Sequence, residues 1–487
     1  MNQAVRRVWV AVVALMAIVL GATTYIQFFA ADSLNNNALN NRQLIANYGQ
    51  PRGAILVDGE PVAESVKNSD GSQFDYRRVY HNADLYSGLT GYYSFASGAT
   101  QLESSQETTL AGTSDSQFFD RLVNLFTGGS DQGANVALTI DPKIQQAAYN
   151  ALPNNFKGSV VVTEPKTGKI LAMVSKPSYD TNLMAVQSTA QLEKNKAALS
   201  EQKNVALNWN AAVYDRVSPG SSFKLLDLVA GLETGDFKVD GEYDNSPDWT
   251  PPGTDKKLAN FDHGSCASRP NKAPLKFIVA QSCNTPFAKT VQKIGQDKMT
   301  EVTERFGFNA KPKDLGLAPT SKSVWPDEDM SAANLAYSSI GQYDVQATTL
   351  QMNMVAMGIA NDGVLMKPQL IQEVTNPNLQ VLESFKAEKI GDVTTKKVAN
   401  DVTELMKQPP LSGTAMQAQV PGVELAAKTG TAQIGDTGRV HAWITGFAPA
   451  DDPEVAITVN VQNISYEESQ GLTSTIMNKV ERAVFDK

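Results

Sequence analysis

The stretch PGSSFKLLDLVAGL, residues 219–232, joins a tight turn to an apolar helix. Pro219 and Gly220 favour the turn, so Ser221 is expected at the helix N-terminus, where unpaired N–H groups and the dipole favour an oxyanion. Lys224 lies one turn later on the same face, and a lysine in an apolar helix is costly unless it finds a partner or loses its proton. The pattern predicts a serine nucleophile with a lysine general base. The alternative is an ordinary N-cap serine beside a lysine that reaches solvent.

Two further motifs follow in order along the chain. Ser282-Cys283-Asn284 comes after the apolar stretch 275–280, and Lys428-Thr429-Gly430-Thr431 ends a β-rich run. Read as S-x-x-K, S-x-N and K-T-G, the three motifs match the active-site set of penicillin-binding proteins and serine β-lactamases. Gly430 would let a substrate backbone lie flat against an edge strand. Taken singly, the second motif also fits a helix C-terminal turn and the third an ordinary strand lysine, so the ordered set carries the prediction.

Each motif also has a chance match elsewhere in the chain: Ser200-Glu201-Gln202-Lys203, Ser33-Leu34-Asn35 and Lys166-Thr167-Gly168. Their surroundings favour other interpretations. Ser200 lies in a polar, charged stretch typical of a solvated helix face, and Ser33 adjoins an apolar N-terminal run. Lys166 belongs to a predicted hairpin turn in which Gly168 supplies the turn backbone.

The N-terminal sequence predicts a membrane anchor. An apolar run extends from Val8 to about Ala31, long enough to span a bilayer as a helix, and Arg6 and Arg7 should keep the short tail in the cytoplasm. The alternative is a cleaved signal peptide, but Phe28 falls at the −3 position of the available cleavage site. The bulk of the chain is therefore expected outside the membrane. A net charge of −9 without a basic run argues against a nucleic-acid partner.

Element patterns predict an α+β fold, with an antiparallel sheet flanked by helices and assembled from distant segments. Residues 158–163 and 169–175 read as a hairpin, residues 423–431, 440–447 and 454–463 as consecutive strands, and residues 473–485 as a closing helix. The expected division is a cytoplasmic tail at 1–7, an anchor at 8–31, a pedestal module of the dimerisation type at 32–132 and the main domain at 133–487.

The two cysteines, Cys266 and Cys283, could form a disulfide outside the cytoplasm. Two unpaired cysteines in different surroundings remain the alternative. We expect no metal and no cofactor, because the sequence has neither H-E-x-x-H nor a phosphate-binding loop. The three histidines do not suggest a Ser-His-Asp triad, and His441 is expected to be a strand residue rather than a catalyst.

The chain resembles class B penicillin-binding proteins over nearly its whole length. Residues 219–224 resemble the nucleophile segment of that family, with Ser222 where Thr is commoner, and residues 281–285 resemble its S-x-N segment. Residues 428–432 and 441–449 resemble the two sheet strands beside its active site. Gly53, residues 90–92 and residues 102–103 are similar to the N-terminal module of actinobacterial members.

This resemblance implies a penicillin-binding transpeptidase domain and a peptidoglycan D,D-transpeptidase that cross-links stem peptides ending in D-Ala-D-Ala. The implied catalytic residues are Ser221 as nucleophile, Lys224 as its base, and Ser282 and Lys428 as the proton path to the leaving group. Asn284, Thr429, Gly430 and Thr431 would bind substrate, the N–H groups of Ser221 and Thr431 forming the oxyanion hole. β-Lactams would trap Ser221 covalently. A polytopic membrane glycosyltransferase is the implied partner.

Three other functions fit the same motifs. A D,D-carboxypeptidase would use water as acceptor, and a β-lactamase would be shorter and free of an anchor. A non-catalytic β-lactam sensor or division scaffold would need a sizeable cytoplasmic output, whereas few residues precede the anchor. A bifunctional synthase is disfavoured by the short N-terminal region. Neither a septation nor an elongation role follows from the sequence.

Overall fold

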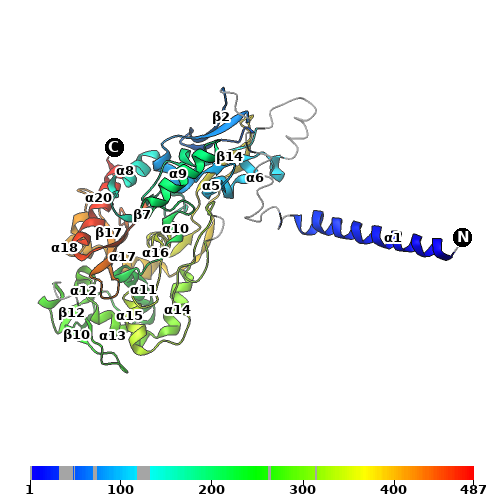
Figure 1. The fold of residues 1–487 in the computed structure, drawn as a ribbon. Helices are drawn as coiled ribbons and strands as arrows, with labels where there is room; N and C mark the ends of the chain where they lie inside the picture. Colours follow the sequence, from blue (N-terminus) through cyan, green and yellow to red (C-terminus); the bar gives the residue numbers. More distant parts are fainter. Residues whose placement is uncertain are drawn as a thin grey trace.

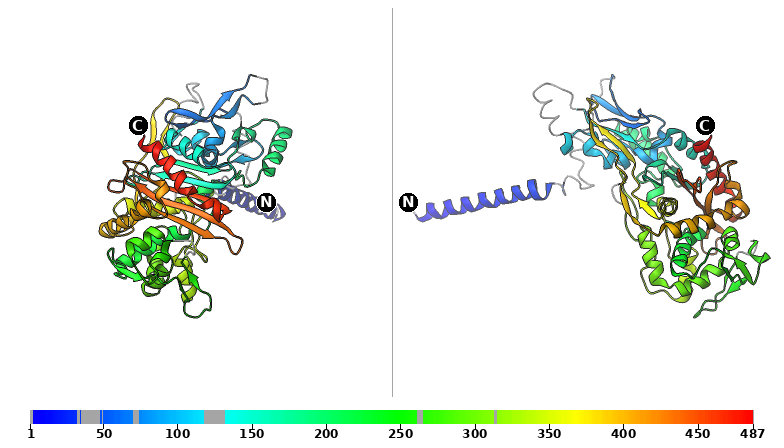
Figure 2. Two further views of the ribbon diagram at one scale, coloured as in Figure 1. Left: turned by 90° about the vertical axis from the view of Figure 1, so that its left-hand side faces the viewer. Right: turned by 180° about the vertical axis from the view of Figure 1, so that it is seen from behind.

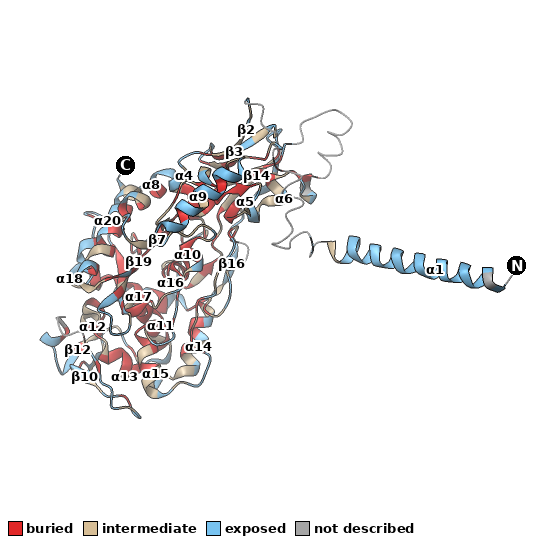
Figure 3. Ribbon diagram, in the orientation of Figure 1, coloured by how far each residue is buried: buried red, intermediate tan, exposed pale blue. Residues whose placement is uncertain are grey.

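The computed structural model describes residues 3–31, 34, 48, 50–69, 74–117, 132–260, 265–312 and 315–486. The rejected motif match at Ser33 lies outside these residues. Helix α1 (Gln3–Thr24) continues into a π-helical turn, η1 (Tyr25–Phe29), and is exposed along its length, in contrast to the buried core (Figures 1 and 3). Residues 5–29 are long enough to cross a membrane, and an 18-residue window within them has a mean hydropathy of 2.1.

A five-stranded antiparallel sheet forms the centre of the larger part of the chain. Its strand order is β17-β18-β19-β7-β8, so segments from both halves of the sequence lie side by side (Figure 2). The strands are β17 (Ala426–Gln433), β18 (Arg439–Ala448), β19 (Val455–Ser465), β7 (Lys157–Thr163) and β8 (Ile170–Lys176). The predicted α+β fold is confirmed, including the hairpin and the three consecutive C-terminal strands.

Helices cover both faces of this sheet. Successive side chains of each strand point to opposite faces, so apolar residues lie on both faces and each face packs against helices. In β19, Ile457 and Val459 pack in the layer with α8 (Pro142–Ala151) and α20 (Leu472–Phe485). On the opposite face, Asn353 of α16 (Thr349–Ala360) donates to the carbonyl of Ala456 at 3.0 Å. Helix α8 begins with the Asp141 carboxylate accepting from its first free N–H groups and a proline at its first position.

Helices on the α16 side of the sheet bury the nucleophile segment. Phe223 stacks on Trp325 with a centroid separation of 5.4 Å, and both side chains are fully buried. The helices of this part are α11 (Lys224–Thr234), α12 (Leu275–Gln281), α13 (Thr285–Ile294), α14 (Gln296–Arg305), α15 (Ala332–Ser339), α17 (Lys396–Met406) and α18 (Gln408–Ser412). Short ribbons accompany them: β9 (Glu242–Asp244), β10 (Asp248–Trp249), β11 (Leu258–Ala259), β12 (Lys272–Pro274), β13 (Val364–Met366) and β16 (Lys389–Asp392).

A second sheet, which the sequence did not predict, joins the N-terminal region to a late segment of the chain. Its order is β15-β14-β6-β1-β2-β3, and the pairing of β1 with β6 is parallel. The strands are β1 (Ile55–Val57), β2 (Glu60–Lys67), β3 (Tyr76–Tyr80), β6 (Asn135–Leu138), β14 (Ile371–Thr375) and β15 (Val381–Ser384). Around it lie α4 (Ala83–Thr90), β4 (Tyr93–Ser94), β5 (Gly98–Ala99), α5 (Gln101–Ser105), α6 (Glu107–Leu110) and α9 (Thr189–Glu201). Helix α10 (Ala211–Tyr214) packs instead against β7, β8 and α16.

A buried ion network stabilises the N-terminal region. Glu103 is fully buried and contacts Arg52 at 3.0 Å and Arg78 at 2.5 Å. Burial alone would raise the pKa of Glu103, but the two guanidinium groups outweigh it and hold that pKa below its usual value. Removing one member would leave an uncompensated buried charge, so we assign the network a structural role.

Candidate active site

The nucleophile segment is a tight 3-10 turn, η4 (Gly220–Phe223), that runs directly into α11. The sequence predicted that Ser221 would begin the α-helix; instead it lies in the turn before it. Gly220 explains the difference, because its φ of 55° and its hydrogen bond to the carbonyl of Gly341 at 2.9 Å tighten the backbone. Ser222 is buried and donates to the Pro219 carbonyl at 2.7 Å, whereas within the described part of the chain no hydrogen bond engages the partly exposed Ser221 hydroxyl.

Strand β17 lies directly against this turn. A Cβ on Gly430 would come within 2.5 Å of the Pro219 carbonyl oxygen, and one on Gly220 within 2.8 Å of the backbone of Thr431. Only glycine at these two positions allows such an approach. The K-T-G motif therefore lies beside the turn that carries Ser221, and the backbone of Thr431 lies against Gly220.

Lys224 is fully buried, and its amine points at the S-x-N segment rather than at solvent. Its Nζ donates to the carbonyls of Ser282 at 2.9 Å and Cys283 at 3.1 Å, and to Asn284 Oδ1 at 2.8 Å. Burial, and next the charge of Lys428, lower the pKa of Lys224 well below its ordinary value, while Asp227 acts in the opposite direction. A lysine that gives up its proton easily suits a general base.

Lys428 is the second fully buried lysine, and it links the other two motifs. Its Nζ donates to Ser282 Oγ at 2.7 Å and to the Thr429 carbonyl at 2.9 Å. Burial lowers the pKa of Lys428 to about 7, so its proton is also easily exchanged. The Ser282 hydroxyl thus lies against one lysine while the Ser282 carbonyl lies against the other.

The S-x-N segment turns sharply between α12 and α13. Ser282 adopts a left-handed conformation with φ of 60°, as the residue that follows a helix often does. Asn284 Nδ2 donates to the Ala259 carbonyl at 2.9 Å, so both ends of its amide have protein partners. All four expected catalytic residues and all four expected substrate-binding residues therefore gather around the junction of η4, α12 and β17.

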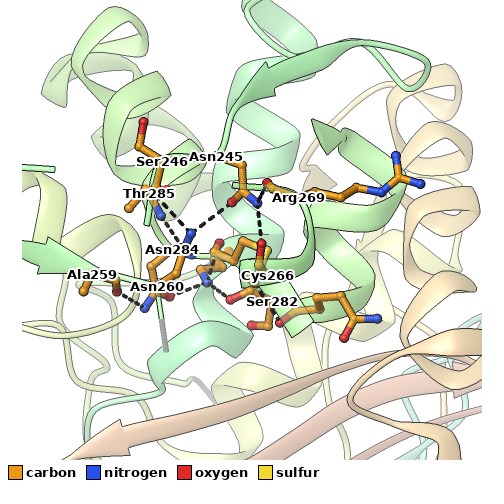
Figure 4. The surroundings of a disulfide bond; sticks show 12 residues. Asn245, Ser246, Ala259, Asn260, Cys266, Arg269, Ser282, Asn284 and Thr285 are labelled. Atoms are coloured by element: carbon orange, nitrogen blue, oxygen red, sulfur yellow. Dashed lines mark hydrogen bonds between the residues drawn. A yellow bond between two sulfur atoms is a disulfide. The ribbon is translucent and has the colours of Figure 1, made fainter. Parts of the chain in front are cut away.

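A disulfide joins Cys266 and Cys283, whose Cα atoms are 5.7 Å apart, and both residues are buried (Figure 4). It ties the middle of the S-x-N motif to the preceding loop. His441, in contrast, lies in β18 opposite Ala432; burial, with Lys157 near it, lowers the pKa of His441 to about 4. The sequence indicated a strand histidine, and the lowered pKa keeps its ring neutral near pH 7.

Replacing both cysteines with alanine should lower the free energy of unfolding by about 3 kcal/mol, because the bridge closes a loop of 17 positions. It should also slow acylation, because the bridge holds the backbone of residue 283, whose carbonyl accepts from Lys224. Denaturant unfolding with and without reductant measures the first effect. The double variant is the control, because its free energy of unfolding should not change when reductant is added. Alkylation of two thiols in the unreduced, unfolded protein would show that the bridge does not form.

Two protein-family models match separate parts of the chain. The penicillin binding protein transpeptidase domain model matches residues 158–481, and the penicillin binding protein A dimerisation domain model matches residues 52–136. The chain belongs to the penicillin-binding protein transpeptidase family.

Members of this family resemble the chain over almost its full length. It is 37% identical to the peptidoglycan D,D-transpeptidase PbpA of Mycolicibacterium smegmatis, covering 95% of this chain and 94% of that protein. The corresponding protein of Mycobacterium tuberculosis is 35% identical with the same coverage. The structure of penicillin-binding protein A from M. tuberculosis as an imipenem acyl-enzyme complex superposes with a TM-score of 0.83 at 33% identity, covering 90% of this chain and 99% of that one.

The structure adds residues that the motifs do not contain. Thr414 Oγ1 lies 2.5 Å from Thr429 Oγ1, so a loop after α18 meets the K-T-G motif. The end of α18, just before this loop, is held to α12, since Gln281 donates to the Ser412 carbonyl at 2.7 Å. Asn260 contacts the backbone of the S-x-N segment. No sequence signal marks these residues, because isolated Thr and Asn are common in loops.

The buried Lys428 should make protein stability depend on pH. Its pKa is about 7 in the folded protein and near 10.4 in an unfolded chain, so unfolding takes up a proton between these values. Stability from this group therefore rises with pH across that range, by up to about 1.4 kcal/mol per unit. The stability of Lys428→Met relative to wild type should accordingly decline from pH 7 to pH 10 in urea unfolding. A constant difference would mean that Lys428 keeps its ordinary pKa.

Proposed function

We propose that this protein is a peptidoglycan D,D-transpeptidase that works through an acyl-enzyme on Ser221. The observation that carries the proposal is the pair of buried lysines, each hydrogen-bonded to Ser282, together with a Ser221 hydroxyl that makes no hydrogen bond to any residue that the structure describes. The names of the relatives support it, as do the acyl-enzyme complexes of the M. tuberculosis protein.

In the proposed reaction, Ser221 Oγ attacks the carbonyl carbon of the penultimate D-Ala, and Lys224 accepts the hydroxyl proton. The amide bond to the last D-Ala breaks, and Ser282 and Lys428 deliver a proton to the departing amine. The amine of a second stem peptide then attacks the ester, restoring Ser221 and completing the cross-link. The lowered pKa of both lysines suits these transfers near neutral pH.

The remaining site residues are proposed to hold the substrate. Lys428, when protonated, and the Thr429 hydroxyl bind its terminal carboxylate. Asn284 has one further amide hydrogen available for a substrate carbonyl. Backbone N–H groups of Ser221 and Thr431 stabilise the oxyanion, each contributing on the order of 3 kcal/mol. Gly430 contributes indirectly, because its missing Cβ lets β17 lie against η4 and so places the strand edge that the peptide approaches.

The surroundings of the enzyme are part of the proposal. Residues 8–31 anchor the chain in the cell membrane after a cytoplasmic tail at 1–7, with the catalytic part on the outer side. Residues 32–132 act as a pedestal for the transpeptidase domain at 133–487. A separate polytopic glycosyltransferase supplies the glycan strands whose stem peptides are cross-linked.

The test is turnover of a synthetic stem pentapeptide by the full chain in detergent, with and without an amine acceptor. Release of D-Ala together with an acceptor-linked product supports transpeptidation. Release of D-Ala without that product at any acceptor concentration would identify a carboxypeptidase. No turnover by a protein that still binds penicillin would favour the sensor or scaffold.

A further inference from the structure

Three asparagines form a ladder beside the disulfide: Asn245, Asn260 and Asn284 (Figure 4). The middle member, Asn260, follows β11 and is 7% exposed. Its Oδ1 accepts from the backbone N–H of Asn284 at 2.6 Å and of Thr285 at 3.0 Å. Its Nδ2 donates to Asn245 Oδ1 at 3.0 Å and to the Ser246 carbonyl at 3.2 Å.

These four bonds use the whole hydrogen-bonding capacity of an asparagine amide. The two backbone N–H partners can only donate, which fixes Oδ1 as the end that faces them. On the far side, Asn245 Nδ2 donates to the carbonyls of Cys266 at 3.1 Å and Arg269 at 2.7 Å. The ladder therefore has one orientation and is braced against the loop that the disulfide closes.

The ladder holds Asn284 from two directions. Asn260 binds its backbone N–H, and the carbonyl of Ala259, the preceding residue, accepts from its side chain at 2.9 Å. With the backbone and Nδ2 both fixed, Asn284 Oδ1 is aimed at Lys224 Nζ, 2.8 Å away. A short chain of hydrogen bonds thus runs from Asn260 to the amine of Lys224.

We propose that Asn260 is a positioning residue for acylation, setting the place of Asn284 and through it the place of the Lys224 amine. The inference rests on the proposed function and adds a residue outside the three motifs. Without Asn260, two N–H groups at the start of α13 lose their acceptor, and Asn284 can leave Lys224. A shift of about 1 Å in a catalytic group can cost roughly 100-fold in rate.

The electrostatics give this role a pH signature. Burial and the charge of Lys428 on β17 lower the pKa of Lys224, and Asp227 on α11 raises it. Asn284 Oδ1 also stabilises the ammonium form, because it accepts a hydrogen bond from Lys224 Nζ. Losing the Oδ1 contact should lower the pKa of Lys224 further. The acidic limb of the acylation rate should therefore move to lower pH, which a merely destabilised protein would not show.

The experiment compares Asn260→Ala with wild type and with Asn353→Ala, using stopped-flow acylation by a fluorescent penicillin from pH 5 to pH 9. Asn353 is a matched control: it is fully buried in α16, accepts from Thr163 at 2.7 Å and donates to two strand carbonyls away from the site. Labelling of wild type on Ser221 is established first, since its absence would refute the proposed function itself.

We expect Asn260→Ala to lower the acylation rate constant roughly 10- to 100-fold, with little change in the initial binding of penicillin and with the acidic limb moved down. Asn353→Ala should be destabilised yet keep the wild-type rate and pH profile. A wild-type profile in Asn260→Ala, or the same rate loss in Asn353→Ala, would overturn the proposal. If Asn260→Ala does not fold, Asn245→Ala, which removes one of the four bonds, is expected to show the same shift in weaker form and decides the question in its place.

Discussion

The Ser221→Ala variant is expected to lose all covalent labelling by a fluorescent penicillin while remaining folded. Ser221 is partly exposed in η4, and its hydroxyl supports no other described group, so its removal should cost little stability. Without that oxygen no acyl ester can form, and the loss should be complete rather than partial. Gel fluorescence measures the labelling, and circular dichroism checks the fold.

The matched control is Ser200→Ala, which removes the serine of the chance S-x-x-K match. Ser200 lies in α9 and is exposed, its hydroxyl bonded to the Lys196 carbonyl of its own helix. This variant should label as wild type. Mass spectrometry of the wild-type adduct should place the label on the peptide that contains Ser221; an adduct on another serine would refute the assignment.

The Lys224→Met variant should acylate slower than wild type by three orders of magnitude or more, on the order of the loss seen when a catalytic base is removed. Methionine keeps the length of the buried side chain and removes only the amine that faces Ser282, Cys283 and Asn284. Stopped-flow acylation with penicillin in excess gives the rate.

Lys203→Met, from the exposed chance match, is the control and should be unaffected. Lys224→Met also shows whether Lys224 or Lys428 is the base that accepts the Ser221 proton. Lys428 remains in place in this variant, so a near wild-type rate would mean that Lys428 or another group accepts the proton from Ser221.

The part of the site whose residues are close together in the sequence could be predicted from it. Ser221 and Lys224 are one turn apart, and the apolar residues after them require burial, so spacing alone suggested a buried lysine beside a serine. The three C-terminal strands were equally readable, since β18 and β19 are long and rich in apolar residues and only short connections separate the three. The disulfide could be named only as a possibility, because two cysteines have no periodicity that reports distance.

Other features depend on contacts between distant segments. The pairing of β1 with β6 involves strands of three and four residues, too short to show alternation or a parallel partner. Asn260 accepts from the backbone N–H groups of residues 284 and 285. Residues of almost any type carry such groups, so no side-chain pattern in the sequence marks this contact. The 3-10 turn at Ser221 depends on Gly341, far along the chain, which accepts the Gly220 N–H.

The shared sheets have a consequence for how the chain folds as it is made. Strand β6 cannot gain its partner β14 until residues 371–375 have been synthesised, and β7 cannot gain β19 until residues 455–465 have followed. Both sheets therefore keep an unpaired edge through most of synthesis, and exposed edges invite pairing with other chains. Nascent chains halted before residue 455 should therefore aggregate or be degraded rather than accumulate as a folded N-terminal part.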